Sequence, residues 1–203
     1  MSVSSAARWS LLSKVALKAR SSHSLSITHD GLLLLYGGEL EPRKPVDTAA
    51  NTSSTANHES LVVTGSVHSY DLKNIENAHH PWVILTPKLN SVVPEARVGA
   101  TIVWDNATQS LYLWGGRGGV DMAALGREQA GLWKGRIITT PSGSIQWERL
   151  IASNENDAPE PRSYHASVFS EVRVPKYSTI SGQDFLENRG KFIFMLDVLH
   201  RVV

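Results

Sequence analysis

The sequence predicts an all-β protein built from a repeated unit of four antiparallel strands, and three observations lead to this prediction. Three arginines, Arg20, Arg97 and Arg162, each precede a run in which apolar and other residues alternate. After the first two runs, a turn containing Asp leads into a second apolar run, which ends in a glycine pair. Alternation bounded by such turns is typical of a β-hairpin, so each arginine marks the first strand of a unit.

The second strand of each unit ends at a glycine pair, Gly37-Gly38 or Gly115-Gly116. A glycine pair lets the backbone turn and lets neighbouring groups approach closely. A polar stretch follows each pair, and then a third strand is predicted at 66–72 and at 131–137. These third strands contain the aromatic residues Tyr70 and Trp133.

A tryptophan opens the predicted fourth strand, Trp82 in the first unit and Trp147 in the second. Trp9 opens a similar stretch, so residues 9–13 are predicted to form a blade-closing strand. Four antiparallel strands in a repeated unit are typical of a β-propeller blade, and large aromatic side chains supply apolar area between stacked blades. The predicted organisation is an N-terminal tail 1–8, the closing strand 9–13, blades 20–86 and 97–151, a partial blade 162–169 and a divergent tail 170–203.

The repeat breaks after the third arginine, because no glycine pair follows the alternating run at 162–169. Residues 190–196 could supply the second strand after an insertion. The sequence thus predicts an incomplete propeller of about two and a half blades, whereas closed propellers have four to eight. Three explanations are possible for this break: a truncated or mis-spliced chain, a half-propeller that assembles with itself, or a divergent tail that completes the sheet. Truncation after about Ser170 is the interpretation that the abrupt loss of pattern favours.

The glycine pairs, the third-strand aromatic and the fourth-strand tryptophan together resemble the kelch repeat, over residues 9 to about 169. Within the kelch family, the stretch "RSSHSLSITHDGLLLLYGGELEPRKPVD" is similar to the first blade of nitrile-specifier and thiocyanate-forming proteins. The kelch resemblance implies a propeller whose loops bind ligands on one face of the ring. The specifier resemblance implies iron-dependent action on glucosinolate breakdown products.

Candidate binding residues lie at the repeat arginines and in the loops that follow the glycine pairs, 39–60 and 117–130. An arginine there could clamp a carboxylate or a sulfate in a bidentate manner, and the alternative is a solvated loop with local salt bridges. The repeated position of three of the arginines suggests a structural role, in bonding blade carbonyls or lining the channel mouth. The candidates are Arg20, Glu39, Arg43, Asp47, Arg97, Arg117, Asp121 and Arg162.

The favoured function is a non-catalytic protein-interaction or ligand-binding module, with a nitrile-specifier-like protein as the alternative. The specifier family's iron motif, Glu-x3-Asp-x3-His, does not occur, because no Glu has an Asp four residues later. No catalytic residues, metal ligands or cofactor are predicted, and an iron cofactor is expected only for the nitrile-specifier-like alternative. The absence of cysteine excludes disulfides and the cysteine–tyrosine cofactor that a galactose oxidase resemblance would imply.

The composition of the sequence limits the classes of partner that the protein is expected to bind. The net charge of +1 argues against a general nucleic-acid binder, and no apolar run is long enough to span a bilayer. An unidentified protein partner is expected, together with possible self-association through open blade edges. A cytoplasmic location is predicted, and the basic, serine-rich N-terminus gives a mitochondrial location as the alternative.

Overall fold

The computed structural model describes an eight-stranded, a three-stranded and a two-stranded sheet, with most of the turns between their strands. The described residues are 7, 9, 11, 13–14, 17–41, 65–74, 79, 81–89, 91–119, 121–138, 143–151 and 158–170, with the backbone of strands 183–188 and 191–196. The described structure is all-β, with one short α-helix, α1 (Arg127–Ala130), and one 3-10 helix, Leu72–Asn74. No helix among these residues is long and apolar enough to cross a membrane.

The first four-stranded unit is an antiparallel meander in which each strand pairs with its neighbour in sequence. Its strands are β1 (Ser24–Ile27), β2 (Leu32–Tyr36), β3 (Val67–Asp71) and β4 (Val83–Pro87). The β1–β2 turn is held by Thr28, whose hydroxyl bonds to Asp30 and accepts the backbone N–H of Leu32 at 2.9 Å. Gly31 has a φ of +88°, a conformation that a side chain would strain.

The second unit repeats this arrangement with strands β5 (Thr101–Asp105), β6 (Ser110–Trp114), β9 (Trp133–Ile138) and β10 (Ser144–Arg149). Buried Asp105 organises the β5–β6 turn, because its carboxylate accepts the N–H of Ala107 and the hydroxyl of Thr108. Between β6 and β9, the loop folds into a small ribbon, β7 (Arg117–Gly118) and β8 (Ala123–Ala124), followed by α1. Arg127 of α1 forms an ion pair with Glu160.

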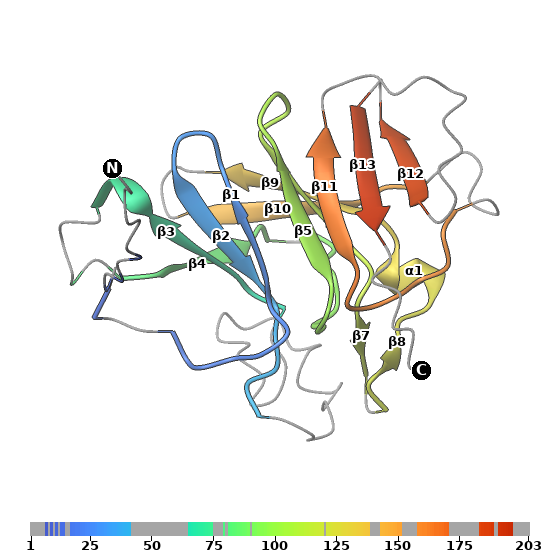
Figure 1. Cartoon of the computed structure of the whole chain (residues 1–203), viewed down its shortest axis with the longest axis horizontal. Coiled ribbons are helices and arrows are strands. Elements are labelled where there is room, and N and C mark those ends of the chain that lie inside the picture. The colour runs from blue at the N-terminus through green and yellow to red at the C-terminus, as the bar shows by residue number, and fades with distance from the viewer. Residues whose placement is uncertain are drawn as a thin grey trace, which may run out of the picture.

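The two units join into one eight-stranded sheet that is nearly closed. The outer strands β4 and β10 pair in parallel over two residues, Thr86 and Pro87 with Ser144 and Ile145. The inner strands β1 and β5, at the two ends of the strand order, lie side by side (Figure 1). This arrangement is compatible with neighbouring blades of a β-propeller.

The main core lies between the two units. Leu34 and Leu111, both fully buried, come from the facing sides of β2 and β6. Tyr36 and Trp147 meet edge to face with ring centroids 6.2 Å apart, a favourable aromatic geometry. Because the core is shared, neither unit could bury its apolar face alone. The complete cluster is Leu34, Tyr36, Val67, Leu85, Ala100, Ile102, Leu111, Leu113, Trp133, Ile145 and Trp147.

A third sheet follows, made by β11 (Ala166–Ser170), β13 (Lys191–Leu196) and β12 (Gln183–Asn188), in that order. Strand β11 lies beside β5, as β5 lies beside β1 (Figure 1). Strand β13 pairs antiparallel with β11, which is the place expected for a delayed second strand at 190–196. The ring of Phe169 stacks on that of Tyr112 and so joins the third sheet to the second unit.

The third strands each contain the predicted aromatic, Tyr70 in β3 and Trp133 in β9. Their positions in the sheet differ, because Tyr70 pairs with Leu33 and Trp133 with Leu113. Since Leu33 stands four residues before its glycine pair and Leu113 two, the two aromatics occupy different rungs of the sheet. Tyr70 packs instead against Trp82, with ring centroids 5.3 Å apart.

The predicted closing strand 9–13 is described only at Trp9, Leu11 and Ser13, none of which lies in a strand. Trp9 is 96% exposed and Leu11 74% exposed. Trp9 thus differs in exposure from Trp147, which is 4% exposed in the main core.

Candidate functional site

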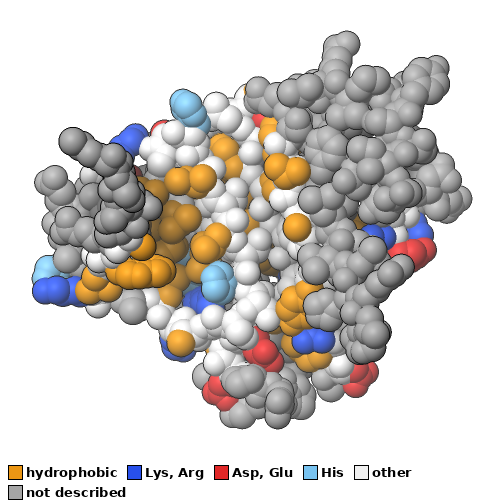
Figure 2. All heavy atoms as spheres, viewed as in Figure 1, with side chains coloured by type: hydrophobic (Ala, Val, Ile, Leu, Met, Phe, Trp, Pro, Cys, Tyr) orange, Lys and Arg blue, Asp and Glu red, His pale blue; other side chains and the backbone are white. Residues whose placement is uncertain are grey.

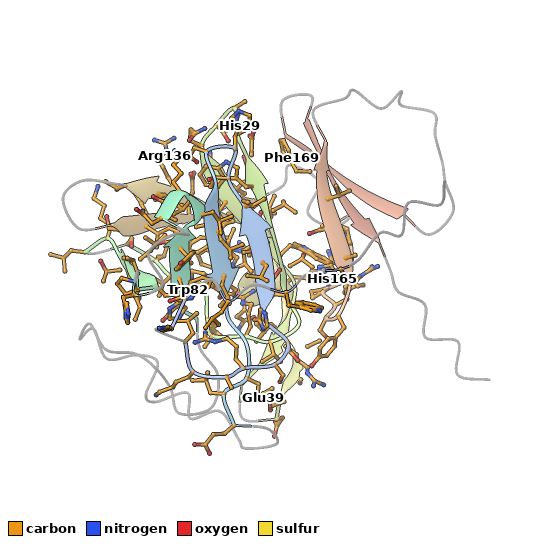
Figure 3. All side chains as sticks on the ribbon, turned by 60° about the vertical axis from the view of Figure 1, so that its left-hand side comes forward. His29, Glu39, Trp82, Arg136, His165 and Phe169 are labelled. Carbon is orange, nitrogen blue, oxygen red and sulfur yellow. The ribbon has the colours of Figure 1, made fainter. Side chains whose placement is uncertain are left out.

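The candidate site lies at what we call the loop end of the sheets, the end at which the glycine pairs close β2 and β6. Glu39, directly after the first pair, is at this end, whereas His29 and Arg136 lie at the opposite end (Figure 3). Each residue that follows a glycine pair forms an antiparallel bridge with the residue that follows a repeat arginine. These bridges are Ser21–Glu39 and Val98–Arg117.

A row of backbone hydrogen bonds crosses the loop end from unit to unit. The residues two places after the repeat arginines are Ser22, Gly99 and Tyr164. The N–H of Gly99 donates to the carbonyl of Ser22 at 2.9 Å, and that of Tyr164 to the carbonyl of Gly99 at 2.8 Å. All three residues have a positive φ, of 57°, 63° and 59°. The three units therefore repeat one local conformation.

Each repeat arginine is held by carbonyl oxygens in its own unit. The Nε atoms of Arg20, Arg97 and Arg162 donate to the carbonyl two residues earlier, at 3.3, 2.9 and 3.1 Å. The Nη1 atoms of the first two donate to the first glycine of their pair, Gly37 or Gly115. This is the carbonyl-bonding role that the repeated position suggests.

The second glycine of each pair connects a unit to the next. Gly38 donates its N–H to the carbonyl of Arg97 at 3.3 Å, and Gly116 donates to that of Arg162 at 2.8 Å. A Cβ atom on Gly116 would lie 3.0 Å from the side chains of Ala100 and Arg97, so the glycine makes room for its own unit's arginine.

Arg97 is fully buried, which removes it from the surface that a ligand could reach. Its third donor, Nη2, bonds the carbonyl of Gln129 at 2.8 Å and so anchors the segment before β9. Burial lowers the pKa of Arg97, while Tyr36 and Glu95 oppose that shift. Burial disfavours the charged form of Tyr36 as well and so raises the pKa of Tyr36, whose hydroxyl donates to the carbonyl of Glu95. Arg97 therefore supports the loop end from inside.

The side chains of Ser22, Arg117 and Tyr164 form a polar cluster at the loop end, which we call the three-unit cluster. Arg117 donates from Nη2 to the Tyr164 hydroxyl at 2.9 Å, and that hydroxyl lies 3.2 Å from the Ser22 Oγ. The Arg117 guanidinium also lies 4.9 Å from the centre of the Tyr164 ring, a cation–π distance. Tyr164 remains 48% exposed, so the cluster is open to solvent.

The other predicted residues are placed differently. Glu39 is partly buried and its backbone pairs with Ser21, while Asp121 is exposed in the turn between β7 and β8. Arg162 is partly buried, and its guanidinium lies 5.8 Å from the centre of the Trp114 ring. Arg43 and Asp47 lie outside the described residues. Of the six candidates among the described residues, Arg117 alone belongs to the three-unit cluster.

Sequence reasoning missed Tyr164 and Ser22 as site residues. The usable signal was the repeat itself, since the position two residues after the arginine carries Ser, Gly and then Tyr. Tyr164 is a bulky aromatic with a φ of 59° at a position where the other two repeats carry small residues, and this exception distinguishes it from them.

The described residues contain no group of three or more His, Asp and Glu side chains placed to hold a metal ion. His165, which stands three residues after the third repeat arginine, packs edge-on against Trp114 and bonds the Thr101 hydroxyl through Nε2. No protein-family model matches this chain, and no curated protein matches it. The function must therefore be argued from the three-unit cluster and its surroundings.

Proposed function

We propose that the chain is a non-catalytic kelch-type propeller module that binds an anionic group of a protein partner or ligand at the three-unit cluster. The observation that carries the proposal is the bonding of Arg117 and Tyr164 at the exposed loop end, with Ser22 beside them. These residues come from three successive repeats, so the cluster exists only when the repeats are stacked.

The chemistry of the cluster suits an anion. A guanidinium has five N–H donors in a planar fork, and Tyr164 accepts one of them. Within the described part of the chain, the buried Nε of Arg117 has no hydrogen-bond partner. An anion in solvent cannot reach this buried atom, so the donors left for a carboxylate or a sulfate are those on the two terminal nitrogens that do not bond Tyr164. The half-exposed Tyr164 ring offers apolar area beside them.

The kelch assignment is supported by the repeated contacts around the arginines and glycine pairs. At both junctions, the N–H of the second glycine donates to the carbonyl of the next unit's repeat arginine. At both, the residue two places after an arginine also donates its N–H to the carbonyl of the equivalent residue in the preceding unit. A repeat that reproduces its junctions atom for atom is what a propeller of stacked blades requires.

The test is an NMR titration that follows the Arg117 Nε–Hε signal. Sodium acetate and sodium sulfate are added separately, with sodium chloride at matched ionic strength as the reference salt. We expect a saturable shift with at least one of the two anions. Removing the hydroxyl in Tyr164→Phe should weaken that binding several-fold, because it frees Arg117 from its fixed orientation.

Arg136→Lys is the matched control, since Arg136 is an exposed arginine at the opposite end of the sheet (Figure 3). This variant should titrate like the unmodified protein, whereas Arg117→Lys should lose the saturable response of nearby backbone signals. Shifts that equal those caused by chloride would rule out the anion site.

A further inference from the structure

The third sheet differs from the two units before it, because it has three strands where they have four. In each complete unit, the fourth strand pairs with the outer edge of the third, as β4 does with β3 and β10 with β9. In the third sheet, β12 takes the third place, and no strand among the described residues pairs with its edge away from β13. Such an edge presents backbone N–H and C=O groups that another strand can bind.

One segment of the chain has the sequence of a fourth strand but is not part of a sheet at its described positions. Residues 9–12 carry a tryptophan followed three residues later by a leucine, as residues 82–85 and 147–150 do. Trp9 and Leu11 lie outside any strand and are among the most exposed apolar residues described.

We infer that residues 8–12 of one copy of this chain, which we call the donor segment, pair with β12 of a second copy as its fourth strand. The second copy returns the same contact. This inference concerns the edge of the third sheet and does not depend on which group binds at the three-unit cluster.

The two complete units specify the register of this pairing. In each unit, a row of neighbouring residues begins seven places after the repeat arginine, crosses the sheet and ends at the fourth-strand tryptophan. The row of the second unit is Trp104, Leu111, Gly135 and Trp147. The row of the first unit is Ile27, Leu33, Tyr70 and Trp82, with the last two rings packed together.

The third sheet contains the same row without its last member. Phe169 stands seven places after Arg162 and pairs with Ile193, which pairs in turn with Leu186. Trp9 of the second copy should therefore stand opposite Leu186. Because the fourth strand runs antiparallel to the third in both complete units, Leu12 should then stand opposite Gln183, and Arg8 opposite Glu187.

The charges of the two partners are complementary. Strand β12 contains Asp184 and Glu187 and no basic residue, whereas the first 20 residues of the chain contain four basic residues and no acidic one. The register places Arg8 of the donor segment directly opposite Glu187. Opposite charges at directly opposite positions stabilise an antiparallel pair.

A second copy is the source of the donor segment because the second unit lies between the first unit and the third sheet. In Figure 1, the blue segment that leads from residue 17 into β1 runs on the side of the first unit that faces away from β12. Closed propellers have at least four blades, so a third sheet does not come round to the first unit. Exchange of an identical element between two protomers is a low-cost route to a dimer.

The exposed apolar side chains over β1 and β2 do not offer a competing docking surface (Figure 2). Strand register places Leu35, His68 and Tyr70 on the same face of the first unit as Leu25 and Ile27. The first three are 6%, 0% and 1% exposed, so this face is already covered within a single chain.

Sedimentation equilibrium and disulfide formation test the exchange. The 203-residue chain should sediment with twice the monomer mass of 22.2 kDa. Because the chain contains no cysteine, Leu12→Cys and Gln183→Cys chains can be mixed and oxidised without background. The mixture should give a disulfide-linked dimer, and neither variant alone should. Asn188→Cys is the control for register, since it stands at the other end of β12 and should not link to Leu12→Cys.

A chain that carries both Leu12→Cys and Gln183→Cys distinguishes exchange from closure within one chain. Exchange predicts that its disulfides join two chains. A disulfide within a monomer would show that the segment completes its own third sheet and would overturn the inference, as would a monomer of the unmodified chain at all concentrations.

Charge reversal tests the register without a disulfide. Each dimer has two pairs of Arg8 and Glu187, so Glu187→Arg or Arg8→Glu alone should weaken the dimer about tenfold. The chain with both changes should regain the original affinity to within about threefold, because each pair is restored in the opposite sense. Lys14→Glu is the matched control, since it makes the same charge change outside the donor segment.

Circular dichroism verifies that each variant folds, and the cysteine mixture remains decisive if Glu187→Arg does not. A double variant that dimerises no more tightly than Arg8→Glu alone, or a loss of affinity in Lys14→Glu equal to that in Arg8→Glu, would overturn the proposed register.

Discussion

Gly115 and Gly119 provide a matched pair of substitutions that measures how tightly the second and third units are joined. Both have nearly the same backbone conformation, with φ of +70° and +71°. A Cβ on Gly115 would lie 2.5 Å from the Arg162 carbonyl oxygen and 2.6 Å from the His165 ring. A Cβ on Gly119 would meet nothing within 4 Å. Alanine at the two positions therefore differs only in what the new methyl group touches.

The expected costs follow from this difference. The left-handed conformation costs a residue with a Cβ about 1–2 kcal/mol, and both variants bear that cost. In Gly115→Ala the methyl group also displaces the third unit, and overpacking of this kind costs about 1–3 kcal/mol. The bond from the Gly116 N–H to the Arg162 carbonyl, now 2.8 Å, would lengthen and lose about 1 kcal/mol. Gly115→Ala should thus lower the free energy of unfolding by about 3–6 kcal/mol, and Gly119→Ala by about 1–2 kcal/mol.

Urea unfolding followed by the fluorescence of the six tryptophans gives both free energies by linear extrapolation. The contact between the units accounts for the difference between the two free energies, which should be about 2–4 kcal/mol. Equal losses within about 0.5 kcal/mol would refute the packing of Arg162 and His165 against the glycine pair.

Three further predictions concern stability. Arg97→Met removes a donor from three carbonyls, those of Glu95, Gly115 and Gln129, although Glu95 keeps the Tyr36 hydroxyl and Gln129 keeps the Trp133 Nε1. The variant should cost about 1–3 kcal/mol in urea unfolding, whereas Arg136→Met at an exposed site should change stability by less than about 0.5 kcal/mol. Gly135→Ala would place a Cβ 2.7 Å from a core side chain of β10 and should cost about 1–3 kcal/mol; an unchanged urea midpoint would contradict the core packing. The pKa of Asp30 is lowered mainly by its hydrogen bond from Thr28, with partial burial opposing it, so its stabilisation is present above the usual pKa of 3.8 and is lost as pH falls through the lowered value. Asp30→Asn should therefore reduce stability slightly at pH 7 and flatten the acid dependence below pH 4 in thermal unfolding; an unchanged acid dependence would argue against that hydrogen bond.

The sequence predicted the all-β repeat because its signals are local. Alternation along a strand, the Asp turns and the glycine pairs each depend on a few adjacent residues, and β1–β2 and β5–β6 form where these signals stand. The third-strand register was not local. Tyr70 and Trp133 each stand in a predicted third strand, but the segments that link the glycine pairs to these strands differ in length. The two aromatics therefore occupy different rungs of the sheet.

The candidate site was harder to predict because its members are brought together by stacking of the units. Arg117 was recognisable as an arginine after a glycine pair, but its partner Tyr164 stands 47 residues later in another unit. Arg97 was a candidate binding residue although its repeated position suggested a structural role, and only the three-dimensional packing shows that it is fully buried. The ribbon and helix within 117–130, β7, β8 and α1, carry no strong periodic pattern and were expected as a loop.

The central claim is that one junction is repeated between successive units. Native-state hydrogen exchange of four amides tests this claim most directly. Gly38 and Gly99 donate across the first junction, and Gly116 and Tyr164 donate across the second. The account predicts strong protection of all four, with the two members of each junction exchanging together. Exchange of Gly116 and Tyr164 at the rate of an unprotected loop, beside protected Gly38 and Gly99, would contradict it and remove the three-unit cluster with it.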